Sequence, residues 1–99
     1  MGYIHAEFSI VPIGTGSTSL SRYIKAAVNA LKAKGLRCEV TGMCTLIECN
    51  SIDELFDALK AAKDAVLALG VKRVELSIRI DERLDKVKSL DEKAKAVSV

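Results

Sequence analysis

Residues 37–54 read RCEVTGMCTLIECNSIDE, and this stretch decides the fold. Arg37 to Thr41 and Thr45 to Asn50 are two short strand-like runs, and Gly42-Met43 between them can supply a tight reversal. Together they predict a hairpin. Residues 51–54 form a capping box, in which a glutamate follows a serine by three positions. This pattern predicts the start of a helix. A hairpin at this point interrupts the alternation of strands and helices that builds a parallel sheet.

The flanking segments supply two further strands and three helices. Residues 3–12 and 73–81 each alternate between apolar and polar side chains, which predicts strands covered on one side. From Leu20, apolar side chains recur with helical spacing until Gly35, and the helix that follows the hairpin runs to Gly70. A sparse apolar stripe predicts a C-terminal helix over residues 84–97 that needs a surface to dock on.

This order of elements predicts a ferredoxin-like α+β fold. The pattern is β-α-β-β-α-β with one added helix, for which we expect an antiparallel sheet of order 4-1-3-2 and two helices on one face. The whole chain, residues 1–99, is expected to form one domain.

Composition and charge narrow the function classes. Hydrophobic residues make up 49% of the chain, charged residues 28%, and the formal net charge of +2 with few aromatics argues against nucleic-acid binding. No apolar run is long enough to span a membrane and no secretory signal precedes the first strand, so we expect a cytoplasmic protein. Three cysteines without a CxxC pair, and one histidine, predict no disulfide framework, no metal site and no catalytic triad.

The loop from Pro12 to Ser21 carries two glycines and five hydroxyl side chains, and it meets the start of a helix. Unpaired N–H groups in a first helical turn can bind a polar or anionic group. A plain N-cap at Ser17 or Ser19 explains the same residues. The topology places this loop and the hairpin at one end of the sheet, so we expect the loop and Thr45 to converge.

The sheet face without helices is expected to be polar. Glu48 and Thr45 are expected to point away from the helices, toward this face. A large open sheet face on a small domain favours a homo-oligomer that buries it, with Glu48 lining a pocket. The open face should carry Glu7, Ser9, Glu48, Ser77 and Arg79, with His5 and Glu75 nearby.

Two enzymatic interpretations fail on the same loop. A dinucleotide-binding fingerprint would have glycine where this chain has Ser19, and no Gly-Lys-Ser/Thr is present for a P-loop. An acylphosphatase-like enzyme would need an arginine in residues 13–21, which contain none. The sequence therefore favours a protein that is not an enzyme.

Four sequence blocks occur together in this chain. They are Ser9-Ile10-Val11-Pro12-Ile13-Gly14-Thr15, Ser17-x-Ser19-x-Ser21-x-Tyr23, Gly42-Met43-x-Thr45-x-x-Glu48 and Ile80-Asp81-x-Arg83. Over roughly residues 3–84 they resemble the signature of a small thiamine-binding family. The resemblance implies a binding protein for thiamine or its hydroxymethylpyrimidine half, assembled as a homo-oligomer, often a tetramer that is a dimer of dimers. Cys44 departs from the family pattern, which commonly has glycine there.

The ligand that the resemblance implies fits the residues already singled out. Glu48 suits the amino group or the positive charge of thiamine. Four hydroxyls could form hydrogen bonds with ring nitrogens or with the ligand hydroxyl. The phosphate of a phosphorylated form could bind at the helix N-terminus. These hydroxyls belong to Thr15, Ser17, Ser19 and Thr45. A ligand-sensing regulatory module with a protein partner is the alternative interpretation, which the sequence leaves open.

Overall fold

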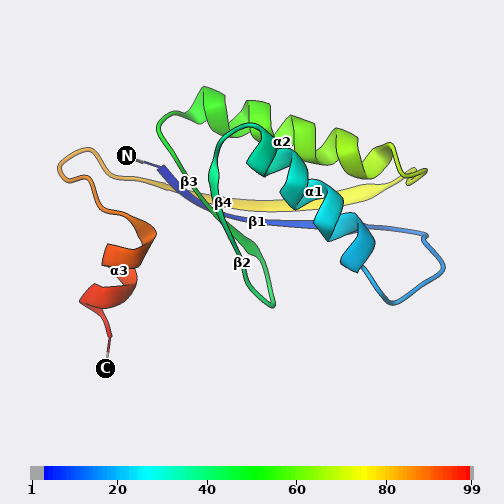
Figure 1. The fold of residues 1–99 in the computed structure, drawn as a ribbon, viewed down its shortest axis with the longest axis horizontal. Coiled ribbons are helices and arrows are strands. Elements are labelled where there is room, and N and C mark those ends of the chain that lie inside the picture. Colours follow the sequence, from blue (N-terminus) through cyan, green and yellow to red (C-terminus); the bar gives the residue numbers. More distant parts are fainter. Residues whose placement is uncertain (1–3, 99) are drawn as a thin grey trace.

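The computed structural model describes residues 4–98, so Tyr3, the expected start of the first strand, lies outside the described part. Four strands and three helices follow in the predicted order (Figure 1). They are β1 (Ile4–Pro12), α1 (Ser21–Ala33), β2 (Arg37–Val40), β3 (Thr45–Cys49), α2 (Ile52–Leu67), β4 (Val74–Glu82) and α3 (Leu90–Ala96).

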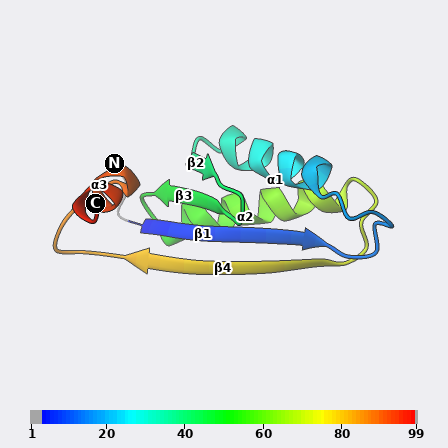
Figure 2. The ribbon, with the colours of Figure 1, turned by 90° about the horizontal axis from the view of Figure 1, so that it is seen from below.

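The sheet has the order β2-β3-β1-β4, and every neighbouring pair is antiparallel. This is the predicted order 4-1-3-2 counted from the other edge, so the ferredoxin-like α+β fold is confirmed. Helices α1 and α2 lie side by side over one face of the sheet (Figure 2).

The core lies between this face and the two helices. Alternate residues of β1 and β3 point into it, and α1 and α2 contribute the apolar stripes seen in the sequence. At the centre, Ile47 of β3 and Leu55 and Val66 of α2 are fully buried. Helix α2 starts where predicted, because the Ser51 hydroxyl accepts a hydrogen bond from the Glu54 N–H at 3.2 Å.

Strand β3 covers only the first half of β1. The pairing runs from Ile4 opposite Cys49 to Phe8 opposite Thr45, whereas β4 pairs with all of β1. The tip of the β2–β3 hairpin therefore lies beside the middle of β1, where the Ser9 hydroxyl donates to the Met43 carbonyl at 3.4 Å. The hairpin lies toward the predicted end of the sheet, where it shares a cleft with the loop that follows β1. Its tip stops short of the end of β1 because β3 is four residues shorter than β1.

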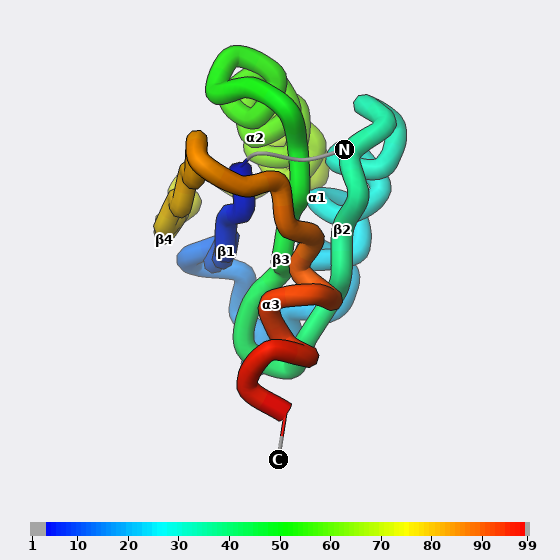
Figure 3. Tube along the Cα trace, turned by 90° about the vertical axis from the view of Figure 1, so that its left-hand side faces the viewer, coloured from blue at the N-terminus to red at the C-terminus, as the bar shows by residue number. Residues whose placement is uncertain are grey.

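The C-terminal helix is shorter than residues 84–97. Ser89 and Glu92 form a reciprocal capping box that starts α3 at Leu90. Upstream, Arg83 pairs with Asp85 at 2.7 Å outside any helix, and Leu84 is 84% exposed. The chain leaves β4 and turns so that α3 lies beyond the sheet from α1 and α2 (Figures 1 and 3).

Helix α3 has no fully buried side chain, although Leu90 is half-buried, and ion pairs join it to the sheet. Arg37 of β2 donates to the Asp91 carboxylate at 3.0 and 3.1 Å, and Lys93 donates to Asp81 of β4. The expected apolar docking is only partial, because Val87 and Leu90 are half-buried whereas Leu84 and Val97 are exposed. None of the helices within residues 4–98 is long and apolar enough to cross a membrane.

Candidate functional site

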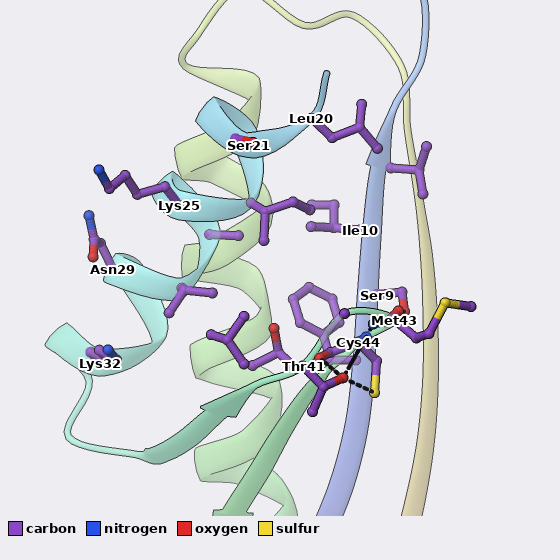
Figure 4. Close-up of a pocket in the computed structure, with 18 of the residues that line it drawn as sticks. Ser9, Ile10, Leu20, Ser21, Lys25, Asn29, Lys32, Thr41, Met43 and Cys44 are labelled. Atoms are coloured by element: carbon purple, nitrogen blue, oxygen red, sulfur yellow. Dashed lines mark hydrogen bonds between the residues drawn. The ribbon is translucent and has the colours of Figure 1, made fainter. Parts of the chain in front are cut away.

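A cleft of about 690 Å³ opens between α1, β1 and the tip of the β2–β3 hairpin (Figure 4). Small-molecule sites commonly have volumes of about 300–1,000 Å³. The lining is mainly apolar with a few hydroxyls, which is the usual character of such sites. The cleft is lined by Phe8–Val11, Thr18, Leu20, Ser21, Ile24, Lys25, Ala27–Asn29, Lys32 and Val40–Thr45.

Thr45 is the most buried polar residue of the cleft. It lies opposite Phe8 in the register and is 5% exposed. The residue lines the cleft, and its hydroxyl makes no hydrogen bond to another side chain or backbone group within residues 4–98. Among the described residues, His5 Nε2 is the fully buried side-chain atom that lacks a partner, so the Thr45 hydroxyl keeps access to the cleft. Thr45 is thus a polar group that a ligand could satisfy.

Thr41 shapes the hairpin tip. Its hydroxyl donates to the Cys44 carbonyl at 2.8 Å and accepts from the N–H groups of Met43 and Cys44 at 3.3 and 3.2 Å. The Cys44 sulfur lies 3.7 Å from the same hydroxyl (Figure 4). Cys44 therefore lies in the cleft wall at the hairpin tip.

The loop hydroxyls fold the loop on itself and lie outside the cleft lining. The Thr15 hydroxyl donates to the Ser17 carbonyl at 3.2 Å, and the Ser17 hydroxyl accepts from the Ser19 N–H at 3.0 Å. Helix α1 begins only at Ser21, and its N-cap is Leu20 without a side-chain bond. The interpretation of Ser17 or Ser19 as the N-cap is therefore wrong, because both precede the helix by too many residues. From this loop, Thr18 and Ser21 reach the cleft instead, and we did not single them out from the sequence.

Glu48 lies on the opposite face of the sheet. Its carboxylate is 3.1 Å from the Arg37 guanidinium and 3.4 Å from the His5 imidazole, and its side chain is 9% exposed. The expectation that Glu48 points away from the helices is confirmed. For Thr45 the same expectation was wrong: the two are three positions apart on one strand, so their side chains point to opposite faces.

The predicted site residues therefore occupy three places. Thr45 is in the cleft, Glu48 is across the sheet, and Thr15, Ser17 and Ser19 are in the outer part of the loop. The convergence of loop and hairpin is present, but it is made by Thr18 and Ser21.

A smaller pocket of about 310 Å³ lies on the open side of the hairpin tip. It shares Ser9, Met43 and Cys44 with the cleft, so the tip separates the two spaces. There the open face carries an ion pair between Glu7 and Arg79 at 3.1 Å.

The three cysteines are free thiols. Burial raises the pKa of the Cys38 thiol and of the Cys49 thiol, which disfavours the reactive thiolate at both positions. Across residues 4–98, no group of three or more His, Cys, Asp or Glu side chains is placed to hold a metal ion.

Comparison with known proteins assigns the family. A family model described as thiamine-binding protein matches residues 6–98. A UPF0045 protein from Methanothermobacter thermautotrophicus is 48% identical over 94 residues, 95% of each chain. The crystal structure of a hypothetical Methanocaldococcus jannaschii protein superposes with a TM-score of 0.87 at 40% identity, covering 98% of this chain and 97% of that chain.

A Thermotoga maritima protein proposed to act in thiamine biosynthesis or salvage shares the fold. Its TM-score is 0.79 at 22% identity, and the match covers 94% of this chain and 96% of that chain. The fold, the four sequence blocks and a family match over nearly the whole length lead to one conclusion: this chain belongs to the thiamine-binding protein family.

Proposed function

We propose that this protein binds thiamine or its hydroxymethylpyrimidine moiety in the cleft between α1 and the β2–β3 hairpin, without converting it. The family match supports the ligand class, and the thiamine-related role proposed for the Thermotoga maritima neighbour agrees with it. The cleft volume suits a ligand of this size.

The observation that carries the proposal is the position of Thr45, a largely buried polar residue in the wall of the cleft. An aminopyrimidine ring presents nitrogen acceptors and an amino donor in one plane, and a threonine hydroxyl can donate to the first or accept from the second. The flat ring faces need apolar walls, which Phe8, Ile24 and Val28 provide beside Thr45. Thr18 and Ser21 add hydroxyls at the α1 end of the same cleft.

Binding without turnover agrees with the residue types in the cleft. Among the described residues that line it, there is no histidine and no carboxylate to act as a general acid or base. Glu48 and His5, the pair best suited to such work, lie on the other side of the sheet.

Titration calorimetry with thiamine and hydroxymethylpyrimidine tests the proposal. We expect both to bind, and Thr45→Val to weaken binding by about 0.5–1.5 kcal/mol, the usual contribution of one hydrogen bond. Thr15→Val is the matched control, because Thr15 lies outside the cleft lining, and it should leave affinity unchanged. No heat with either compound at millimolar concentration would overturn the proposal. Product formation from either compound would overturn its non-enzymatic part.

A further inference from the structure

We propose that the cleft selects a phosphorylated form of its ligand, with the phosphate monoester held by Lys25, Asn29 and Lys32 of α1. This inference rests on the proposed function. It goes beyond it because it assigns the ionic state of the ligand and names the residues that bind its phosphate.

The charged side chains in the described lining of the cleft are all positive. Lys25 and Lys32 are the only charged residues in its described lining, and all the other polar groups there are neutral. The chain has 13 carboxylate side chains and a net charge of only +2, so a wall with two lysines and no acid is a local property of the cleft.

Neither lysine is neutralised by the protein itself. Within residues 4–98, no carboxylate lies within ion-pair distance of Lys25 or Lys32, whereas Lys34, Lys63 and Lys93 each pair with an aspartate. The positive thiazolium of unphosphorylated thiamine would add a like charge beside them, and a phosphate monoester, with a charge of about −1.5 to −2 at pH 7, would compensate them.

The spacing of the three side chains fits one anion. Positions 25, 29 and 32 share one side of a helix, and Figure 4 shows Lys25, Asn29 and Lys32 one above the other along α1. The two lysines are about 10 Å apart along the helix axis. Their flexible four-carbon stems allow both ammonium groups to approach an anion in front of Asn29, whose amide adds a donor.

This arrangement divides the cleft into two parts. Thr45 belongs to β3 and lies on the sheet side of the cleft. Lys25, Asn29 and Lys32 are exposed at its outer rim, and Figure 4 shows Lys25 and Asn29 extending from α1 on the side away from Ile10. A ring bound at Thr45 can therefore extend its phosphate toward solvent, where a dianion keeps part of its hydration.

The experiment compares hydroxymethylpyrimidine with its monophosphate by titration calorimetry, at low and high NaCl concentration. For the natural sequence we expect the monophosphate to bind about tenfold more tightly in low salt, the effect of two exposed ion contacts. Added salt should remove most of this difference by screening. Lys25→Gln/Lys32→Gln should also remove it, while leaving the affinity for hydroxymethylpyrimidine within about twofold.

The control variant Lys60→Gln/Lys72→Gln makes the same change in net charge away from the cleft, and it should keep the preference for the monophosphate. Equal affinity for the two compounds in the natural sequence, or an equal loss of preference in both double variants, would overturn this inference while leaving the proposed function intact. If neither compound binds, both this inference and the proposed function are overturned.

Discussion

At the scale of single residues, the open face of the sheet is organised around Glu48. Arg37, Glu48, His5 and Asp81 occupy one row across all four strands. Glu48 lies in the middle of this row, with a cationic partner on one side and an imidazole on the other. Its surroundings are those of a structural ion-pair partner.

We therefore expect Glu48→Gln to affect stability more than ligand binding. The variant keeps the shape of the side chain but removes the charge that Arg37 and His5 face. The free energy of unfolding should fall by about 1.5–3 kcal/mol, the range for hydrogen bonds to charged groups. Urea unfolding measures this change, and calorimetry with hydroxymethylpyrimidine should give an unchanged affinity. A clear loss of affinity at unchanged stability would instead show that Glu48 contacts the ligand.

Alternation along the strands predicted the residues of both sheet faces except one. His5, Glu7, Glu48 and Arg79 are on the open face as expected, since a strand turns every second side chain to the same side. Thr45 was placed on the wrong face, because it is separated by two and four positions from Ile47 and Cys49 and therefore shares their helix-covered side. The loop hydroxyls could not be placed from composition. Their positions depend on the positive φ angles of Gly14 and Gly16, 84° and 76°, which local sequence permits but does not specify.

At the scale of secondary-structure elements, helix α2 supplies much of the core. Leu59 packs in the buried cluster with the strands and lies away from the cleft lining. Leu59→Ala should therefore lower the free energy of unfolding by about 2–5 kcal/mol, because a buried cavity remains. Thermal or urea unfolding tests this, and the ligand affinity of the folded fraction should not change. A loss below about 1 kcal/mol would show that the core collapses into the space.

Helix α3 should detach without unfolding the sheet. Asp91→Asn/Lys93→Gln removes both of its ion pairs, and α3 has no buried side chain to hold it afterwards. We expect faster hydrogen exchange of residues 90–96 and an unchanged midpoint of global thermal unfolding. Lys95→Gln, on the same helix, is the control and should leave exchange unchanged. Loss of the cooperative transition in the double variant would contradict the interpretation.

Acid should release α3 in the unaltered protein. The hydrogen bond and positive charge of Lys93 hold the pKa of Asp81 below its ordinary value. Stabilisation from a carboxyl with a lowered folded-state pKa is fully present above the unfolded-state value, about 3.9, and is lost as pH falls through the folded-state value. Exchange at residues 90–96 should therefore be constant from pH 5 to 8, after correction for the intrinsic rate, and rise below pH 4. A rise already between pH 5 and 7 would point to another group.

The elements themselves were predictable, and their lengths less so. Periodicity located both core helices because each has one apolar side. The capping box at Ser89 and Glu92 is a sequence signal that we missed, and it would have shortened the last helix correctly. The hairpin strands were located to within one residue. Their register against β1, which places the hairpin tip beside the middle of that strand, has no signal in the local sequence.

At the scale of the whole molecule, two surfaces within residues 4–98 stay exposed. One is the part of the open sheet face that carries Ser77 and Arg79, whereas His5 and Glu48 on the same face are largely buried. The other is the free edge of β4, where Leu76 and Ile78 are each 38% exposed. Nine residues of unpaired edge with exposed apolar side chains are uncommon on a monomer, since such edges invite further pairing.

We therefore expect a homo-oligomer, with a tetramer built as a dimer of dimers. Light scattering at micromolar concentration should give four times the chain mass of 10.7 kDa. Ser77→Arg adds bulk and charge at an exposed position on the open face, beside Arg79. If that face is an interface, the variant should lower the mass without lowering the helical signal. A mass of one chain for the natural sequence would refute the assembly.

The short pairing between β3 and β1 has a consequence for how such a site can change. From Ser9 onward, β1 pairs only with β4, so the sheet is narrower there. The cleft lies next to this narrower part, between the hairpin tip and the start of α1. Adding two residues to each hairpin strand would advance the tip by about 7 Å along β1, and removing two would withdraw it equally far. The length of the hairpin therefore sets how far the cleft extends along β1. Insertions at one surface turn could tailor the cleft to shorter or longer ligands while the buried core stays as it is.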